Sequence, residues 1–255
     1  MKIGAYQFPV TGNITENLSR ILAAVDQASQ KGVELLAFPE CAVTGYPPLS
    51  VPSASAVSME QADQACLQIR EAAIRHHMYL LAGTITRRDA SFRNAALFFA
   101  PDGTVTEYGK RALWGWDREN FTPGNQPGIV RAGALDIGVR ICFEVRFPEY
   151  FRELYRAGTD LNIILFHDVS DHADPDRYAM IRGHIQTRAV ENVCPVLAVN
   201  TAAPFQSAPT VLFDASGRVL GEAEPGKETL LTFDFEKKEP GFGELGRKTI
   251  SDSLL

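Results

Sequence analysis

Hydrophobic and polar positions change their spacing along the first half of the chain, and each spacing predicts an element. Apolar residues recur at helical intervals between Leu18 and Val25, which predicts a helix over residues 13–31 that ends at Gly32. The continuous apolar run over residues 33–38 is typical of a strand buried on both faces. The same reasoning predicts a second helix at 56–76 and strands at 2–7, 79–86, 95–100 and 105–108.

The second half of the chain repeats this alternation. Strands are predicted at 135–142, 161–166, 196–200, 210–213 and 219–222, and helices at 148–157 and 178–192. The segments that lead into Glu40 and into Asp168 resemble each other, which indicates either an internal repeat or only the strand–helix order common to such chains. The pattern predicts an α/β fold with mixed sheets and helices outside. No break in composition divides residues 1–255, so we expect a single domain.

Composition and charge narrow the class of protein. The 255 residues are 45% hydrophobic and 22% charged, which excludes a disordered chain and a coiled coil. A net charge of −6 without a dense basic cluster argues against a nucleic-acid partner, and no apolar run is long enough to span a membrane. The four cysteines form no CxxC pair, no glycine-rich phosphate loop occurs, and the first residues do not resemble a signal peptide. We therefore expect free thiols, no metal, no cofactor and a cytoplasmic location.

Three reactive side chains stand at the ends of predicted strands, where the sites of α/β proteins usually lie. Cys142 ends the strand at 135–142 shortly before a helix, and helix starts provide free backbone N–H groups. Glu40 follows a buried strand, where desolvation makes a carboxylate a better base. Lys110 follows the strand at 105–108, from which an ammonium group can face an oxyanion. Taken singly, each residue fits an ordinary role better: a buried structural cysteine, an exposed loop acid and a solvated lysine.

The surroundings of these three residues resemble a known family. Phe38-Pro39-Glu40, the segment 108–111 and the segment 140–149 are similar to the three signature segments of the nitrilase superfamily, also called carbon–nitrogen hydrolases, and occur in the same order. Further similar segments run along nearly the whole chain: Thr44-Gly45-Tyr46-Pro47, Phe121-Thr122-Pro123-Gly124 and Arg188-Ala189-Val190-Glu191-Asn192. Together these segments resemble the amidase-like branch of the superfamily.

The resemblance implies a four-layer αββα sandwich, with two mixed sheets inside, helices outside, and a homodimer formed through the outer helices. It also implies that Cys142 is the nucleophile, that Glu40 is the general base, and that Lys110 binds the oxyanion together with the backbone N–H of Phe143. Many members carry a further glutamate after the lysine that helps to hold the site. Glu119 is the best match to that glutamate.

Five residues are candidates for substrate binding. Trp114 and Trp116 lie on a predicted loop after the lysine and fit equally well in a pocket wall or at a dimer edge, and Tyr46 is placed similarly. Arg146 is either a group that binds a substrate carboxylate or, more simply, half of an ion pair that holds the turn after the cysteine. His167 lies in a polar stretch where family members usually carry proline or small residues, which leaves the substrate preference open.

We therefore predict a hydrolase that cleaves the non-peptide C–N bond of a small linear amide through a cysteine thioester, with release of ammonia or an amine. An N-carbamoyl compound or, less readily, a nitrile would use the same residues. An inactive binding or scaffold protein on the same fold would show a broken triad, whereas Glu40, Lys110 and Cys142 are all present. The expected partners are the amide substrate and a second copy of the chain.

Overall fold

Two six-stranded mixed sheets form the centre of the computed structural model, which describes residues 1–254. The first sheet has the order β12 (Thr229–Asp234), β1 (Lys2–Gln7), β2 (Leu35–Ala37), β3 (Tyr79–Arg88), β4 (Ser91–Phe99) and β5 (Val105–Gly109). The second has the order β6 (Ile129–Ala132), β7 (Leu135–Ile141), β8 (Leu161–Leu165), β9 (Val196–Val199), β10 (Val211–Phe213) and β11 (Val219–Glu222).

The two sheets share one topology. In the first, β1, β2 and β3 are parallel, β4 and β5 continue antiparallel, and β12 pairs antiparallel with β1 at the opposite edge. In the second, β7, β8 and β9 are parallel, β10 and β11 continue antiparallel, and β6 pairs antiparallel with β7. The similar segments before Glu40 and Asp168 therefore occupy equivalent places, at β2 and at β8.

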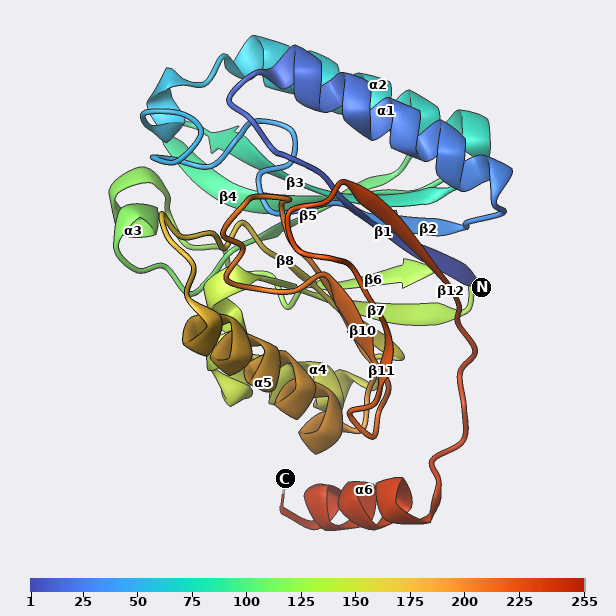
Figure 1. Cartoon of the computed structure of the whole chain (residues 1–255). Coiled ribbons are helices and arrows are strands. Elements are labelled where there is room, and N and C mark those ends of the chain that lie inside the picture. Colours follow the sequence, from blue (N-terminus) through green and yellow to red (C-terminus); the bar gives the residue numbers. More distant parts are fainter. Residues whose placement is uncertain (255) are drawn as a thin grey trace.

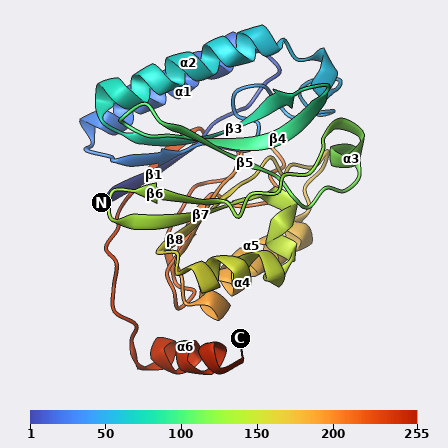
Figure 2. The same ribbon diagram turned by 180° about the vertical axis from the view of Figure 1, so that it is seen from behind.

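Helices cover the outer face of each sheet, as Figures 1 and 2 show from opposite sides. α1 (Ile14–Gln30) and α2 (Met59–His76) lie over the first sheet, and α4 (Pro148–Ala157) and α5 (Pro175–Asn192) lie over the second. Three apolar layers fill the spaces: one under α1 and α2, one between the sheets, and one under α4 and α5. This is the four-layer αββα sandwich that the resemblance to the nitrilase superfamily implies.

Local sequence explains where these helices begin. The Asn13 side chain accepts hydrogen bonds from the backbone N–H groups of Thr15 and Glu16 at the start of α1. Asp174 caps α5 in the same way, and α4 and α5 each place a proline in the first turn, where its missing N–H costs nothing. The caps fix the ends of the helices and thereby the loops between helix and sheet that carry the site.

The structure differs from the predicted elements mainly at the edges. The strands β6 and β12 and the helix α6 (Phe242–Leu254) have no counterpart in the prediction. Three short helices are also unpredicted. η1 (Ala54–Ala56) lies at the start of the predicted helix 56–76, and α3 (Trp116–Asn120) lies in a segment predicted to be a loop. η2 (Cys142–Arg146) begins at the last residue of the predicted strand 135–142. α6 has no buried residue and lies beyond α4 and α5, at the bottom of Figure 1. Its large apolar side chains, among them Phe242 and Ile250, are exposed and do not pack against the core.

Candidate active site

Glu40 lies three residues after the end of β2, in a tight segment that packs against β3. Gly83 of β3 donates its backbone N–H to the Pro39 carbonyl at 3.1 Å, and its carbonyl accepts from the Val43 N–H at 3.1 Å. A Cβ at position 83 would lie 2.4 Å from both the Pro39 carbonyl oxygen and the Cys41 nitrogen. Only glycine lets the backbone of the Glu40 segment approach β3 so closely.

The Glu40 carboxylate is buried, and both of its oxygens accept hydrogen bonds. Its Oε1 accepts hydrogen bonds from Lys110 Nζ at 2.9 Å and from Asn94 Nδ2 at 2.6 Å. Its Oε2 accepts from the backbone N–H of His167 at 2.9 Å, which ties the end of β2 to the end of β8 across the sandwich. Burial raises the pKa of Glu40, the Lys110 charge opposes this rise, and the nearby Asp117 adds to it. A carboxyl group with a raised pKa is suited to both accept and return a proton near neutral pH.

Lys110 lies between two carboxylates in the protein interior. Its Nζ is 2.9 Å from Glu40 Oε1 and 2.7 Å from Asp117 Oδ2, and all three side chains are almost completely buried. Asp117 in turn accepts a hydrogen bond from the Tyr46 hydroxyl at 2.8 Å. Burial alone would lower the pKa of Lys110, but the two carboxylates outweigh it and hold that pKa well above its ordinary value. The ammonium group is therefore a fixed positive charge in water-poor surroundings, where it acts strongly on nearby charge.

Cys142 stands at the end of β7 in a conformation that few non-glycine residues adopt. Its φ is 47°, and η2 begins at this residue. Phe143 is therefore in the first turn of a helix, where backbone N–H groups lack a partner inside the helix. Burial raises the pKa of the Cys142 thiol, Glu40 adds to the rise, and Lys110 opposes it. The thiol is thus protonated at neutral pH and needs a base in order to attack.

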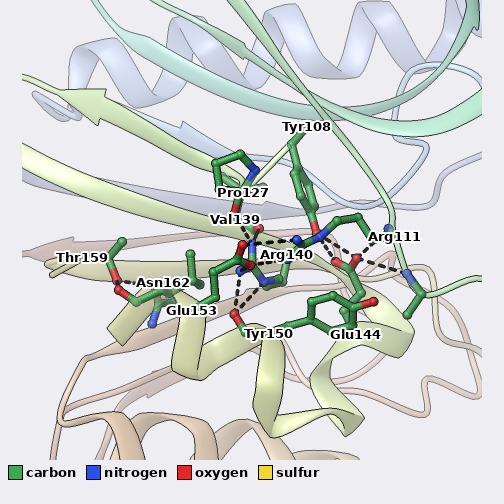
Figure 3. Close-up of polar contacts among 12 residues, drawn as sticks. Tyr108, Arg111, Pro127, Val139, Arg140, Glu144, Tyr150, Glu153, Thr159 and Asn162 are labelled. Atoms are coloured by element: carbon green, nitrogen blue, oxygen red, sulfur yellow. Dashed lines mark hydrogen bonds and ion pairs between the residues drawn. The ribbon is translucent and has the colours of Figure 1, made fainter. Parts of the chain in front are cut away.

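The Glu144 carboxylate links the turn at Cys142 to the segment that follows Lys110 by hydrogen bonds (Figure 3). Its Oε2 accepts from the Ile141 N–H at 2.7 Å, and its Oε1 accepts from the Arg111 N–H at 2.7 Å. The Tyr108 hydroxyl donates to the same carboxylate at 2.7 Å. Tyr108 and Arg111 lie on either side of Lys110 in the chain, so this buried carboxylate fixes the lysine and the cysteine relative to each other.

A small pocket of about 170 Å³ opens onto these groups. Lys110, Asp117 and Cys142 line it together, and Glu40 contacts Lys110. The structure therefore gathers Glu40, Lys110 and Cys142, which follow β2, β5 and β7, in one place. A cavity on this scale has room for a short acyl group.

The structure does not place Glu119 with these groups. Glu119 is exposed near the end of α3, whereas Asp117, two residues earlier on the same short helix, is buried and contacts Lys110. Residues two apart on a helix point in different directions, so only one of them can face the lysine. The expectation for Glu119 is therefore wrong in position, and an aspartate occupies the place predicted for a glutamate.

The candidate substrate-binding residues all line the pocket. Tyr46 and His167 are buried with their rings stacked 5.4 Å apart, while Trp114 and Trp116 are 65% and 49% exposed at its mouth. Within residues 1–254, no carboxylate lies within ion-pair distance of Arg146, whose guanidinium instead lies 5.6 Å from the centre of the Phe143 ring. The simpler prediction for Arg146 was an ion pair that holds the turn after Cys142. Among these residues, that ion pair is not formed.

Several site residues escape prediction from sequence. Asn94 gives no local signal, because only the pairing of β3 with β4 brings it to Glu40. Arg177 pairs with Asp168 at 2.8 Å and also lines the pocket, and no motif in the sequence identifies that pair. In the part of the chain that the structure describes, no cluster of side chains could hold a metal ion, and no helix is long and apolar enough to cross a membrane.

Comparison with known proteins assigns the family. The model of the carbon-nitrogen hydrolase family matches residues 2–239, so the chain belongs to this family, as its signature segments indicate. A (R)-stereoselective amidase from a Pseudomonas species is 27% identical over 83% of this chain and 76% of that protein. A deaminated glutathione amidase from Synechocystis is 27% identical over 87% of this chain and 88% of its own length. An omega-amidase from Xenopus tropicalis is 27% identical, but the match covers only 63% of this chain and 61% of that protein.

Solved structures of an amidase from Nesterenkonia have the same fold. A mutant of that amidase in complex with butyramide superimposes with a TM-score of 0.81, at 26% identity over 92% of this chain and 90% of that one. Another mutant shows covalent addition of the acetamide moiety of fluoroacetamide at its active-site cysteine, with a TM-score of 0.83 at 26% identity over 93% of this chain and 90% of that one. The predicted family, fold class and enzyme class, a carbon–nitrogen hydrolase, are thus confirmed.

Proposed function

We propose that this protein is an amidase that hydrolyses a small linear amide through a thioester on Cys142. The observation that carries the proposal is the buried chain of contacts from Asp117 through Lys110 to Glu40, beside Cys142 in the wall of the same pocket. The amidase names of its relatives support the same class of substrate.

The reaction follows from the positions of these groups. Glu40 takes the proton from the Cys142 thiol as the sulfur attacks the amide carbonyl carbon, and the carbonyl electrons move to oxygen. The ammonium group of Lys110 and the backbone N–H of Phe143 stabilise this oxyanion. The oxyanion then collapses and the C–N bond breaks, while Glu40 gives its proton to the departing nitrogen and a thioester remains.

Hydrolysis of the thioester uses the same groups once more. Glu40 takes a proton from water, and the resulting hydroxide adds to the thioester carbonyl. Collapse of this second oxyanion releases the carboxylic acid and breaks the carbon–sulfur bond, and the sulfur recovers its proton from Glu40. Asp117 keeps Lys110 charged and oriented throughout both halves of the cycle, because its carboxylate forms a second buried ion pair with the ammonium group.

The test is release of ammonia from a panel of short amides. Wild-type protein should release ammonia with a carboxylic acid as the second product, and Cys142→Ala should abolish release. Cys66→Ala is the matched control, because Cys66 is a partly exposed thiol on α2, remote from the pocket. Release that survives Cys142→Ala would overturn the proposal, and release of carbon dioxide with ammonia would assign an N-carbamoyl substrate instead.

We also propose that the protein acts as a cytoplasmic homodimer. All four cysteines are free, which suits a reducing compartment. The outer helix α6 exposes several large apolar side chains, which favour contact with a second copy: Phe242 (98% exposed), Leu245 (53%), Ile250 (61%) and Leu254 (79%). Native mass spectrometry should show twice the chain mass, and a purely monomeric spectrum at micromolar concentration would contradict the dimer.

A further inference from the structure

A buried positive charge lies inside β7, two residues before the nucleophile. The side chains at 137, 139 and 141 of this strand pack between the sheets, whereas Arg140 points to the opposite face, which α4 covers. The Arg140 side chain is completely buried, and burial lowers its pKa because a charged group is costly to take out of water. A buried cation therefore needs partners that offset this cost.

The guanidinium of Arg140 ties β7 to α4. Its Nη2 donates to the Tyr150 carbonyl at 2.6 Å and to Glu153 Oε2 at 2.9 Å, and its Nη1 donates to the Pro127 carbonyl at 2.8 Å. Among these acceptors, only the Glu153 carboxylate carries a full negative charge. The Glu153 side chain is 37% exposed. The charge of the buried guanidinium is thus balanced by a residue of the outer helix.

The same carboxylate also holds Arg111, the residue directly after Lys110. Arg111 Nη1 donates to Glu153 Oε1 at 3.3 Å, and Arg111 Nη2 forms an ion pair with Oε2 (Figure 3). One carboxylate of α4 therefore bridges two guanidinium groups, one beside the reacting lysine and one beside the reacting cysteine. In addition to burial, the Arg111 charge lowers the pKa of Arg140, so the two cations repel each other.

This repulsion gives the Glu153 charge a consequence for the active site. Without it, two cations would face each other in water-poor surroundings, where like charges repel strongly. Because Arg140 is completely buried and Arg111 is 17% exposed, Arg111 is the residue that can move toward solvent. The backbone N–H of Arg111 donates to Glu144 at 2.7 Å. A displaced Arg111 would therefore shift the lysine segment relative to the cysteine turn.

We propose that Glu153 is a positioning residue of the active site, because it bridges Arg111 and Arg140 and so holds the lysine segment and the cysteine strand against α4. The inference rests on the amidase function proposed above and adds an outer helix to the elements that set its rate. Glu153 does not line the pocket, so its effect passes through the two arginines and then through the backbone next to Lys110.

A change of charge at nearly constant shape tests the bridge. In Glu153→Gln, kcat for butyramide should fall by roughly tenfold, since even a small displacement of reacting groups slows a reaction, and KM should change by less than about twofold. Glu153→Asp keeps the charge and should recover part of kcat. Glu71→Gln is the matched control and should leave both constants unchanged, because Glu71 is an exposed carboxylate on α2, over the other sheet.

A second readout depends on no amide substrate. Iodoacetamide alkylates thiolates, so its rate of addition to Cys142, followed by peptide mass spectrometry, reports how well the neighbouring groups activate this thiol. Glu153→Gln should slow the labelling of Cys142 severalfold and leave the labelling of Cys66 on α2 unchanged. In an Arg111→Gln background, Glu153→Gln should have a much smaller effect on kcat and on labelling, because the repulsion between two cations is then absent.

The outcomes separate this inference from the proposed function. If the wild type hydrolyses no amide in a Cys142-dependent way, the amidase proposal fails, and the labelling rates decide the role of Glu153. If Glu153→Gln matches Glu71→Gln in kcat and labelling and lowers only the urea midpoint of unfolding, the amidase stands and the positioning role is refuted. Faster labelling of Cys142, or a raised KM at unchanged kcat, also refutes it.

The urea midpoints show that each variant is folded under the assay conditions. Should Glu153→Gln not fold, Glu153→Asp takes its place, because its shorter side chain cannot span both arginines as Glu153 does. A smaller fall in kcat and in Cys142 labelling is then expected, and wild-type values for both would refute the positioning role.

Discussion

Replacing Asp117 by asparagine removes one of the two carboxylates that hold Lys110. The ion pair has an Nζ–Oδ2 distance of 2.7 Å, and its side chains are 1% and 4% exposed. Removing one partner of a buried ion pair costs about 3–5 kcal/mol of stability. Lys110 keeps its ion pair with Glu40 at 2.9 Å in this variant. We therefore expect a loss of stability at the lower end of this range, about 3 kcal/mol. With an unfolding slope near 3 kcal/mol per molar urea, the midpoint should fall by roughly 1 M.

The same variant should move the pH dependence of kcat/KM in a defined direction. Glu40 must be ionised to take the thiol proton, and the negative charge of Asp117 raises the pKa of Glu40. Without that charge the ionised form is favoured, so the acidic limb of the profile should move to lower pH. The Lys110 pKa, which both carboxylates raise, should also fall, so any alkaline limb moves the same way.

Glu119→Gln is the matched control for Asp117→Asn. Glu119 is an exposed carboxylate two residues away on α3, so its replacement should change stability by less than about 0.5 kcal/mol and leave the pH profile in place. Urea unfolding and amide hydrolysis across pH measure both effects. Equal behaviour of the two variants, or an acidic limb that moves to higher pH in Asp117→Asn, would refute the assignment of Asp117 as the second carboxylate.

Three further substitutions test how the site is held. Asn94→Ala should move the acidic limb to higher pH, because burial raises the pKa of Glu40 and the Asn94 hydrogen bond opposes that rise; a pH–rate profile checks the direction. Gly124→Ala would place a Cβ 2.2 Å from the Gly109 carbonyl oxygen, so urea unfolding should show a loss of about 1–3 kcal/mol; a wild-type midpoint would contradict this close packing. Glu144→Gln should lower the free energy of unfolding by about 1–3 kcal/mol and should lower kcat more than it changes KM. The reason is that an amide has only one oxygen to accept the hydrogen bonds that two carboxylate oxygens accept. An unchanged kcat would show that the Glu144 carboxylate does not position the site.

The elements that build the core were predictable because each carries a strong local pattern. β8 is a buried and almost wholly apolar strand, and α1 has an apolar stripe with Asn13 at its start. α6 and β12 were not predicted, although the apolar residues of α6 recur at helical intervals. α6 buries no residue and β12 has no fully buried position, so their places depend on contacts with distant segments, such as the hydrogen bond from Arg247 to the Ala215 carbonyl, which local sequence does not reveal.

The reacting residues were predictable for a different reason. Glu40, Lys110 and Cys142 stand in segments whose neighbours are themselves distinctive, and each follows or ends a strand. The supporting carboxylate was placed two residues too late, because the sequence does not reveal that a short helix starts at Trp116 and turns Asp117 inward. Contacts made across the sandwich, such as that of His167 with Glu40, depend on the relative position of the two sheets and on no local pattern.

Peptide mass spectrometry of the acid-quenched enzyme during turnover of a short amide tests the central claim most directly. The account predicts a mass increase of one acyl group on the peptide that contains Cys142, lost on incubation with water and absent from Cys142→Ala. An acyl group found on any other residue, or turnover without a covalent intermediate under conditions that trap thioesters, would contradict it.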